Sequence, residues 1–192
     1  PILFNIVMKP RLTICIVHYN KIDELQQTVS TLSECTREPY HLKILNNGYE
    51  DKQIRSYLTA LEDRERTEVL YNDENIGCSP GRNQLMRDVD TEFVMTLDDD
   101  MYVEDGWFKT VLDIFETNPE IGVVGIPYKR RGSDQIRGGA HVTIDSNVVE
   151  MEEINWSTVS TDDPYILVDD VPAGTMVCRC ELLNEFAWDP QY

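Results

Sequence analysis

The chain has 192 residues, of which 41% are hydrophobic, 17 are Lys or Arg and 35 are Asp or Glu. This composition excludes a disordered tail, a collagen-like repeat and a membrane span, and the length favours one domain over residues 1–192. The formal net charge of −18 repels polyanions, so we expect no nucleic-acid partner. A phosphate-bearing ligand needs local help here, from basic side chains, helix N-termini or a divalent cation.

Cysteine usage and hydropathy bear on the compartment. The five cysteines are odd in number and widely spread, and they form no C-x-x-C pair, which is typical of a reducing environment. No apolar run approaches the roughly 20 residues that a transmembrane helix needs. We therefore expect a cytoplasmic protein with no transmembrane segment in this chain.

The first two thirds of the chain alternate between strand and helix patterns. In chain order, the expected elements are a strand at 12–18, a helix from 22 to 32, a strand at 41–45, a helix from 54 to 61, a strand at 67–71, a helix through 82–86, a strand at 93–97, a helix from 107 to 115 and a strand at 121–126. This alternation predicts an α/β fold with a mostly parallel sheet and helices on both faces. Ligands of such sheets bind at the carboxyl ends of the strands.

Two helix starts carry local signals. Asn20 is expected to cap the first helix, and Ser79 is expected to cap the third, with Pro80 at its first position.

The pattern changes beyond Tyr128. A hairpin strand is expected within 141–151, another strand at 165–171 and a weak helix near 181–186. The basic run 129–131 is either a solvated loop or a contact for an anionic acceptor or a diphosphate. Trp156 and Trp188 lie in this part, where a tryptophan either packs in the core or stacks on a sugar ring.

Three adjacent carboxylates, Asp98, Asp99 and Asp100, follow the strand at 93–97. They are either a solvated acidic turn or ligands of a hard divalent cation such as Mg²⁺ or Mn²⁺. An EF-hand is excluded, because Tyr102 and Val103 would stand where that loop needs an oxygen ligand and a glycine. A dinucleotide fingerprint or P-loop is excluded as well, because no glycine follows the first strand.

An ordered set of segments carries a family resemblance. The segments are Val17-His-Tyr-Asn20, Asn46-Asn-Gly48 with Asp51, Asn75-Ile-Gly77, Gly81-Arg-Asn83, Leu97-Asp-Asp-Asp100 and Gly174-Thr-Met-Val-Cys-Arg179. From Thr13 to Tyr192, the chain resembles the nucleotide-sugar-binding domain of a family 2 glycosyltransferase with the GT-A fold. The stretch at 97–100 resembles the D-x-D motif of that family.

The resemblance implies a single GT-A (Rossmann-like) domain, with a nucleotide-sugar-binding half at 11–127 and a smaller antiparallel acceptor-side half at 128–192. It implies a metal-dependent, inverting glycosyltransferase. The donor would be a nucleoside diphosphate sugar, with a UDP-sugar favoured, and the acceptor hydroxyl would belong to a carbohydrate, a lipid-linked molecule or a protein.

The resemblance also implies roles for particular residues. Asp100 and Asp98 would hold Mn²⁺ or Mg²⁺, with Asp98 or Asp99 near the ribose. For Arg82, a solvated position on a helix face remains an alternative to a contact with the base or a phosphate. The residues expected to bind the nucleotide sugar are His18, Tyr19, Asn20, Asn46, Asn75, Gly77, Arg82, Asp98 and Asp99.

Two features depart from the family pattern. Asn46 stands where the family usually has an aspartate that accepts a hydrogen bond from uracil, so the base preference is open. The family's general base lies past the segment that matches 186–189, and we expect it beyond Tyr192 in a longer enzyme. The alternatives are that Asp169, Asp170 or Asp189 serves as the base, or that the chain is a non-catalytic donor-binding module. A nucleotidyltransferase is disfavoured because a glycine-rich, basic first loop is absent.

Overall fold

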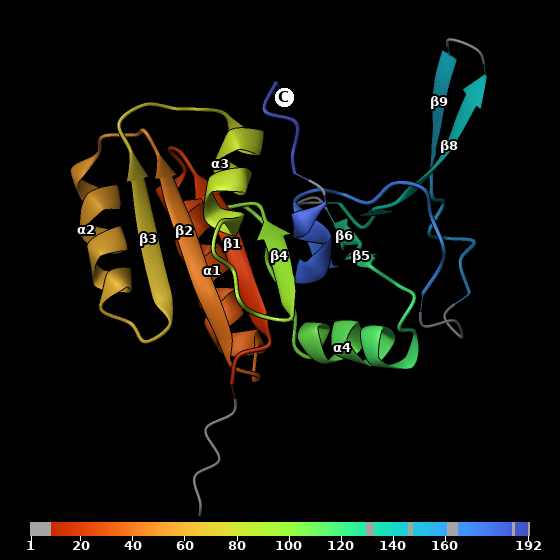
Figure 1. The fold of residues 1–192 in the computed structure, drawn as a ribbon, viewed down its shortest axis with the longest axis horizontal. Coiled ribbons are helices and arrows are strands. Elements are labelled where there is room, and N and C mark those ends of the chain that lie inside the picture. Colours follow the sequence, from red (N-terminus) through yellow and green to blue (C-terminus); the bar gives the residue numbers. More distant parts are fainter. Residues whose placement is uncertain (1–8, 130–132, 146–147, 161–164, 186, 192) are drawn as a thin grey trace, which may run out of the picture.

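A computed structural model describes residues 9–129, 133–145, 148–160, 165–185 and 187–191. Its centre is a six-stranded sheet in the order β3-β2-β1-β4-β10-β5 (Figure 1). The strands β1 to β4 pair in parallel, and β10 pairs antiparallel with both β4 and β5. Their bounds are β1 Leu12–His18, β2 Tyr40–Asn47, β3 Thr67–Asn72, β4 Phe93–Leu97, β5 Val123–Gly125 and β10 Thr175–Arg179. The predicted α/β fold with a mostly parallel sheet is confirmed.

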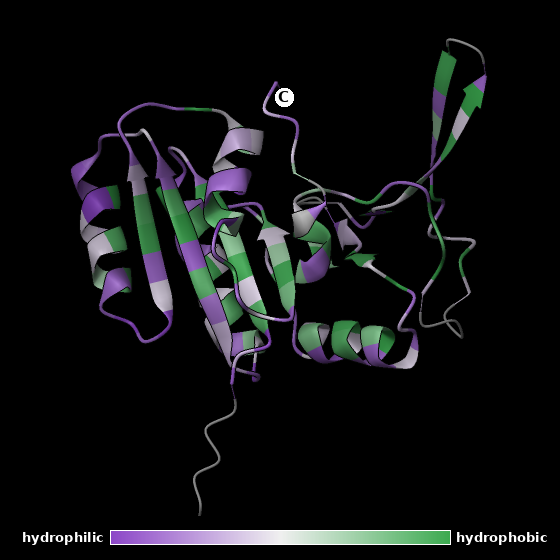
Figure 2. Ribbon diagram, in the orientation of Figure 1, coloured by the Kyte–Doolittle hydropathy of each residue, from purple (hydrophilic) through white to green (hydrophobic). Residues whose placement is uncertain are grey.

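Helices cover both faces of this sheet (Figure 1). They are α1 Ile22–Cys35, α2 Lys52–Glu62, α3 Cys78–Met86 and α4 Trp107–Thr117, with a 3₁₀ helix, η1, at Cys180–Asn184. Apolar side chains of α1, α2 and α4 pack on one face, and those of α3 and η1 pack on the other. Both faces of β1 and β4 are therefore buried, which is why these strands are almost continuously hydrophobic (Figure 2).

A smaller antiparallel region lies beside the sheet. It contains the pair β6 (Tyr128–Lys129) with β7 (Ile136–Arg137) and the hairpin of β8 (Ala140–Asp145) with β9 (Val148–Glu153). The hairpin projects away from the sheet at the upper right of Figure 1. The basic run at 129–131 falls mostly outside the described residues.

Both predicted helix caps are wrong. Lys21, not Asn20, holds the cap position of α1, and its side chain makes no capping hydrogen bond. The helix α3 starts at Cys78, and Gly77 precedes it with φ +91°, a conformation that favours glycine. Ser79 and Pro80 therefore lie inside the first turn.

Two strand predictions also need correction. The strand expected at 121–126 is shorter and lies at the sheet edge, where it pairs with β10 and not with β4. Residues 165–171 form no strand, and Asp170 makes only an isolated bridge with Ala140. An apolar run predicts extended backbone, but it does not specify the neighbouring strand.

Candidate functional site

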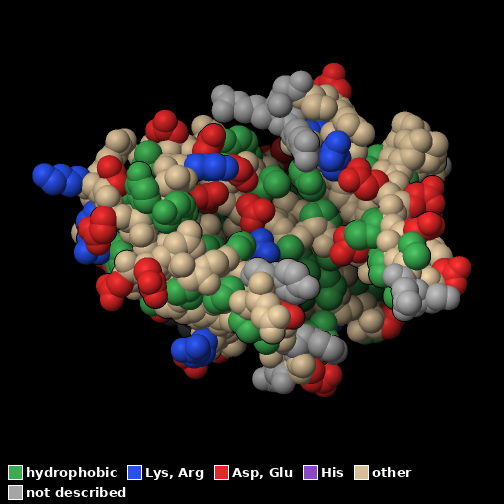
Figure 3. Space-filling model, turned by 90° about the horizontal axis from the view of Figure 1, so that it is seen from above, with side chains coloured by type: hydrophobic (Ala, Val, Ile, Leu, Met, Phe, Trp, Pro, Cys, Tyr) green, Lys and Arg blue, Asp and Glu red, His purple; other side chains and the backbone are tan. Residues whose placement is uncertain are grey.

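The candidate site lies where the parallel strands end. Asp98, Asp99 and Asp100 follow β4, and His18 ends β1 in register with Asn46 of β2. Because parallel strands end at one edge of a sheet, residues from three strands come together here. Seen from above, the surface is hollowed beside this edge, and Asp and Glu side chains stand around the hollow (Figure 3).

Asp98 is paired with Arg82 of α3. The guanidinium Nη2 donates to Asp98 Oδ1 over 2.8 Å, and the Arg82 side chain is only 11% exposed. Its guanidinium carbon also lies 4.9 Å from the centre of the Trp188 ring. Arg82 is therefore held between a carboxylate and an aromatic ring, which excludes the alternative of a solvated helix-face arginine.

Asp99 accepts a hydrogen bond from a buried histidine. Nδ1 of His18 donates to Asp99 Oδ2 over 2.7 Å, and the His18 side chain is 0% exposed. Thr28 of α1 donates to the backbone oxygen of Asp99. Within the described residues, Nε2 of His18 is buried without a hydrogen-bond partner. His18 thus supports the acidic loop from inside the protein.

The pair of Lys21 and Asp100 is the most exposed of the three ion pairs. Nζ of Lys21 donates to Asp100 Oδ2 over 2.9 Å, and the side chains are 54% and 39% exposed, respectively. This hydrogen bond raises the pKa of the Lys21 ammonium above its ordinary value. Each of the three carboxylates therefore has its own basic partner. The partner of Asp98 comes from α3, that of Asp99 from β1 and that of Asp100 from the loop after β1.

A glycine makes room for Asp98. The backbone N–H of Asp98 donates to the carbonyl oxygen of Gly174 over 3.0 Å. A Cβ on Gly174 would lie 2.1 Å from Asp98 Oδ2, so any side chain at this position would displace the carboxylate. Sequence reasoning gave Gly174 no such role, although its place as the first residue of the family-like segment 174–179 was a usable signal.

The loops after β1 and β2 meet through two tyrosines. Tyr19 and Asn20 are exposed, and the Tyr19 ring packs edge-on against Tyr49 with centroids 5.1 Å apart. The Asn46 side chain donates to the Tyr49 carbonyl and accepts from the Tyr49 N–H. Both ends of this amide are therefore used in the turn, and its contact with a base stays a prediction.

The predicted pair Asn75 and Gly77 lies in the loop before α3, which a buried amide organises. Asn47 donates to Asn75 Oδ1 over 2.9 Å and to the Gly77 carbonyl over 3.1 Å, and it accepts from the N–H of Ile76. Sequence reasoning missed Asn47, which looked like part of an Asn-Gly turn. At Gly48, with φ +80°, a Cβ would lie 2.1 Å from the Glu74 backbone, so these two loops touch.

The candidate bases lie in different places. Asp169 accepts from the N–H of Val142 and from His141, and these hydrogen bonds lower its pKa. Asp170 forms the backbone bridge at the foot of the hairpin. Asp189 accepts from the N–H of Gln191, and it follows Trp188, which contacts Arg82. Only Asp189 is adjacent in the chain to a residue that contacts the acidic site.

The segment that carries Trp188 is fastened to α3. Asn83 donates to the Trp188 carbonyl over 2.7 Å and accepts from the Trp188 N–H over 2.9 Å. This two-way pairing explains how a residue near the end of the chain reaches Arg82. Sequence reasoning listed Asn83 only as part of a motif.

Metal-binding side chains and thiols are the other groups of the described residues that could carry chemistry. Within the described residues, no group of three or more His, Cys, Asp or Glu side chains is arranged to hold a metal by itself. All five cysteines are described, and each is a free thiol. Burial raises the pKa of Cys15 to about 12 and that of Cys180 to about 11, so these thiols stay protonated at neutral pH. No helix in the described ranges is long and apolar enough to cross a bilayer.

The fold and the site together define a class. A mostly parallel sheet with an acidic cluster at its carboxyl edge and an antiparallel region beside it is the GT-A architecture. The model of the family described as Glycosyl transferase family 2 matches residues 13–185. The chain belongs to this family.

Relatives and solved structures agree with this assignment. A glucosyl-dolichyl phosphate glucuronosyltransferase of Haloferax volcanii is 29% identical over 121 residues, covering 62% of this chain and 37% of the relative. The S. aureus TarS 1-349 structure superposes with a TM-score of 0.67 at 16% identity, over 94% of this chain and 51% of that one. The mannosyltransferase PcManGT of Pyrobaculum calidifontis, in complex with GDP-Man and Mn²⁺, gives a TM-score of 0.53 at 19% identity, over 65% and 37%. The chain thus spans only about a third to a half of these proteins.

Proposed function

We propose that the chain is the donor-binding part of a metal-dependent, inverting glycosyltransferase. It transfers a sugar from a nucleoside diphosphate sugar, with a UDP-sugar favoured, to a hydroxyl of a carbohydrate, a lipid-linked molecule or a protein. Residues 11–127 bind the donor, and 128–192 form the acceptor side. TarS has been solved with UDP and with UDP-GlcNAc, which supports a uridine nucleotide.

One observation carries the proposal. Three carboxylates at the end of β4 each face a basic side chain, so the edge of the sheet offers both anionic and cationic groups to a ligand. A diphosphate needs such cations in a protein with a net charge of −18. Arg82, which is held in place by Asp98 and Trp188, and Lys21 supply two cationic donors for its oxygens.

The residues present also fit a metal. Asp98 and Asp100 are 43% and 39% exposed, and carboxylate oxygens are the ligands that Mg²⁺ and Mn²⁺ prefer. Sites for such metals commonly use one or two carboxylates together with the phosphates of the substrate, so a third protein ligand is not required. When bound, the metal supplies Lewis-acid stabilisation of the diphosphate leaving group. Asp99, tied to His18, keeps the loop in place, and Asp98 or Asp99 would lie near the ribose.

Calorimetric titration of UDP into the chain, with and without Mn²⁺, tests the donor site. We expect Mn²⁺-dependent binding that falls by roughly tenfold or more in Asp100→Asn, because the variant loses a charged oxygen ligand. Asp105→Asn is the matched control, since Asp105 is an exposed carboxylate that pairs with Arg37 outside the cluster. Binding of equal strength with and without Mn²⁺, or an equal loss in both variants, would contradict the metal site.

A second candidate function is a donor-binding module without turnover. It is favoured by the positions of Asp169 and Asp170, whose hydrogen bonds are to the hairpin and not to the acidic site. Incubation of a protein extended past Tyr192 with UDP-sugars, saccharide acceptors and Mn²⁺, followed by mass spectrometry of the products, separates the two. Tight UDP binding without any transferred sugar would favour the module.

A further inference from the structure

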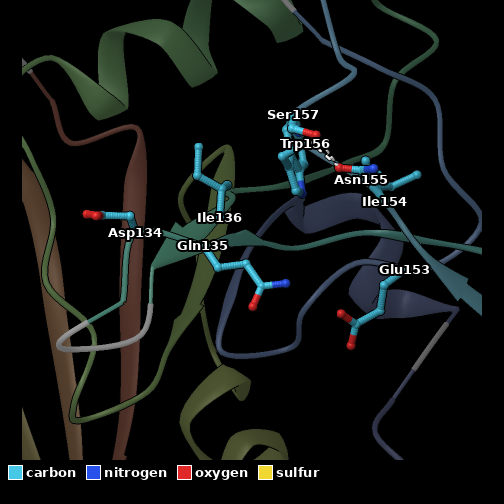
Figure 4. A pocket seen from close by; sticks show the side chains of 8 residues that line it. All are labelled: Asp134, Gln135, Ile136, Glu153, Ile154, Asn155, Trp156 and Ser157. Carbon is cyan, nitrogen blue, oxygen red and sulfur yellow. Dashed lines mark hydrogen bonds between the residues drawn. The ribbon is translucent and has the colours of Figure 1, made fainter.

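A second hollow lies in the antiparallel region, apart from the acidic cluster. It has a volume of about 460 Å³ and is formed by β7, the end of β9 and the turn that follows β9 (Figure 4). We propose that this hollow is the acceptor subsite and that it takes an uncharged saccharide. This inference rests on the proposed glycosyl transfer. The residues that line the hollow include Gln135, Ile136, Glu153, Ile154, Trp156 and Ser157.

Trp156 gives the hollow an aromatic wall. Its indole Nε1 donates to the carbonyl oxygen of Gly138 over 2.8 Å, and the side chain is half-buried. The only polar atom of the indole is therefore satisfied within the protein, and the ring is fixed in place. An aromatic surface of this kind complements the C–H face of a pyranose ring. Ile136 and Ile154 add further apolar lining.

Polar groups stand opposite the aromatic wall. The side chains of Gln135 and Glu153 extend toward one another across the hollow (Figure 4). A carboxylate accepts short, strong hydrogen bonds from hydroxyl groups, and an amide both accepts and donates. The Oδ1 atom of Asn155 accepts hydrogen bonds from the N–H and the hydroxyl of Ser157, so this side chain shapes the turn. A pocket of this size with an apolar wall and a few polar groups suits a small polyhydroxylated ligand.

A short segment connects the hollow to the acidic site. Asp170 is bonded to Ala140 at the foot of the hairpin, and Gly174 accepts from the N–H of Asp98. Asp170 and Gly174 are four positions apart, so even a fully extended chain separates them by at most about 14 Å. Gly138, which accepts from Trp156, packs closely against Pro172 in the middle of this segment. The hollow is thus linked to Asp98 through Trp156, Gly138 and the segment 170–174.

The charge of the lining selects the ligand class. Glu153 and Asp134 are the charged residues of the lining, and both are anionic. Among the described residues, Arg137 lies 3.8 Å from Glu153, and Lys129 pairs across the strands with Ile136. Phosphate or uronate groups would meet net repulsion from this lining. The basic run 129–131 precedes the strand β7 in the chain, and it would instead favour an anionic saccharide. The experiment therefore compares both kinds.

Saturation-transfer NMR with the whole chain tests the subsite. The probes are the uncharged disaccharides cellobiose, maltose, lactose and diacetylchitobiose, with glucose 6-phosphate and glucuronate as the anionic arm. We expect binding of at least one uncharged probe, a drop of roughly tenfold in Trp156→Ala and a smaller drop in Glu153→Gln. Glu150→Gln, on the other face of the hairpin, is the matched control and should bind like the unsubstituted chain.

Two further measurements keep the result decisive. Trp156→Phe retains an aromatic ring without the bond to Gly138 and should bind better than Trp156→Ala, provided that circular dichroism shows both variants folded. UDP binding with Mn²⁺ should be unchanged in all of them. If UDP binds but no uncharged probe does, if an anionic probe binds more tightly, or if Trp156→Ala has no effect, the acceptor subsite is wrong. If saccharide binding depends on Trp156 but UDP does not bind, the proposed function fails and the saccharide site stands.

Discussion

At the residue scale, the Asp98 carboxylate depends on the absence of a side chain at Gly174. In Gly174→Ala the new Cβ would lie 2.1 Å from Asp98 Oδ2, so the carboxylate must move. We expect Mn²⁺-dependent UDP binding to weaken by roughly tenfold, measured by calorimetry. Gly106→Ala is the control: it has open space but φ +82°, so it should cost about 1 kcal/mol of stability and leave binding intact. Unchanged binding in Gly174→Ala would show that Asp98 is not a ligand in this position.

His18 is the other residue that positions the acidic loop. His18→Leu removes the hydrogen bond to Asp99 and leaves that carboxylate, only 16% exposed, without its partner. We expect the free energy of unfolding to fall by about 1–3 kcal/mol in urea denaturation. His141→Leu is the matched control, because His141 is exposed and should change stability by no more than about 0.5 kcal/mol. Equal losses in the two variants would contradict a supporting role for His18.

At the scale of single elements, α2 has the best-defined start. Asp51 accepts hydrogen bonds from the N–H groups of Gln53 and Ile54, and Ile54, Leu58 and Leu61 anchor the helix in the core. Asp51→Ala should lower the free energy of unfolding by about 1 kcal/mol, measured in urea. Asp51→Asn should retain most of it, because asparagine caps almost as well. An equal loss in both variants would show that the charge, and not the cap, stabilises α2.

Elements with a local signal were predicted well. The strands β1 and β4 and the helix α4 have apolar patterns that depend only on their own residues, and they were found where expected. The helix α1 was also located, but its capping position is Lys21 and not the predicted Asn20. Residues 165–171 have an extended pattern but only one bridge partner, which no local pattern reports.

At the scale of the whole molecule, the net charge of −18 has opposite consequences for the metal-free and the metal-dependent binding of UDP. Without metal, UDP is repelled by the protein field, and salt at about 0.1 M screens charges beyond roughly 10 Å. Added NaCl should therefore strengthen metal-free UDP binding. Attraction of Mn²⁺ is screened in the same way, so NaCl should weaken the metal-dependent binding. Titrations at several NaCl concentrations, with sucrose as the uncharged control, test this; the same sign in both series would contradict it.

The sequence by itself determined the order of strands and helices from β1 to α4 and the position of Asp98 to Asp100 after a buried strand, but it did not predict β10. Those features follow from apolar periodicity and turn chemistry over a few residues. Only the tertiary structure decided that Asp98 meets Arg82, that Asp99 meets His18 and that Asp100 meets Lys21, across 16, 81 and 79 positions of the chain. It also decided that β10 separates β4 from β5. Such contacts depend on which strands become neighbours, and that is set by packing of the whole sheet and not by any local pattern.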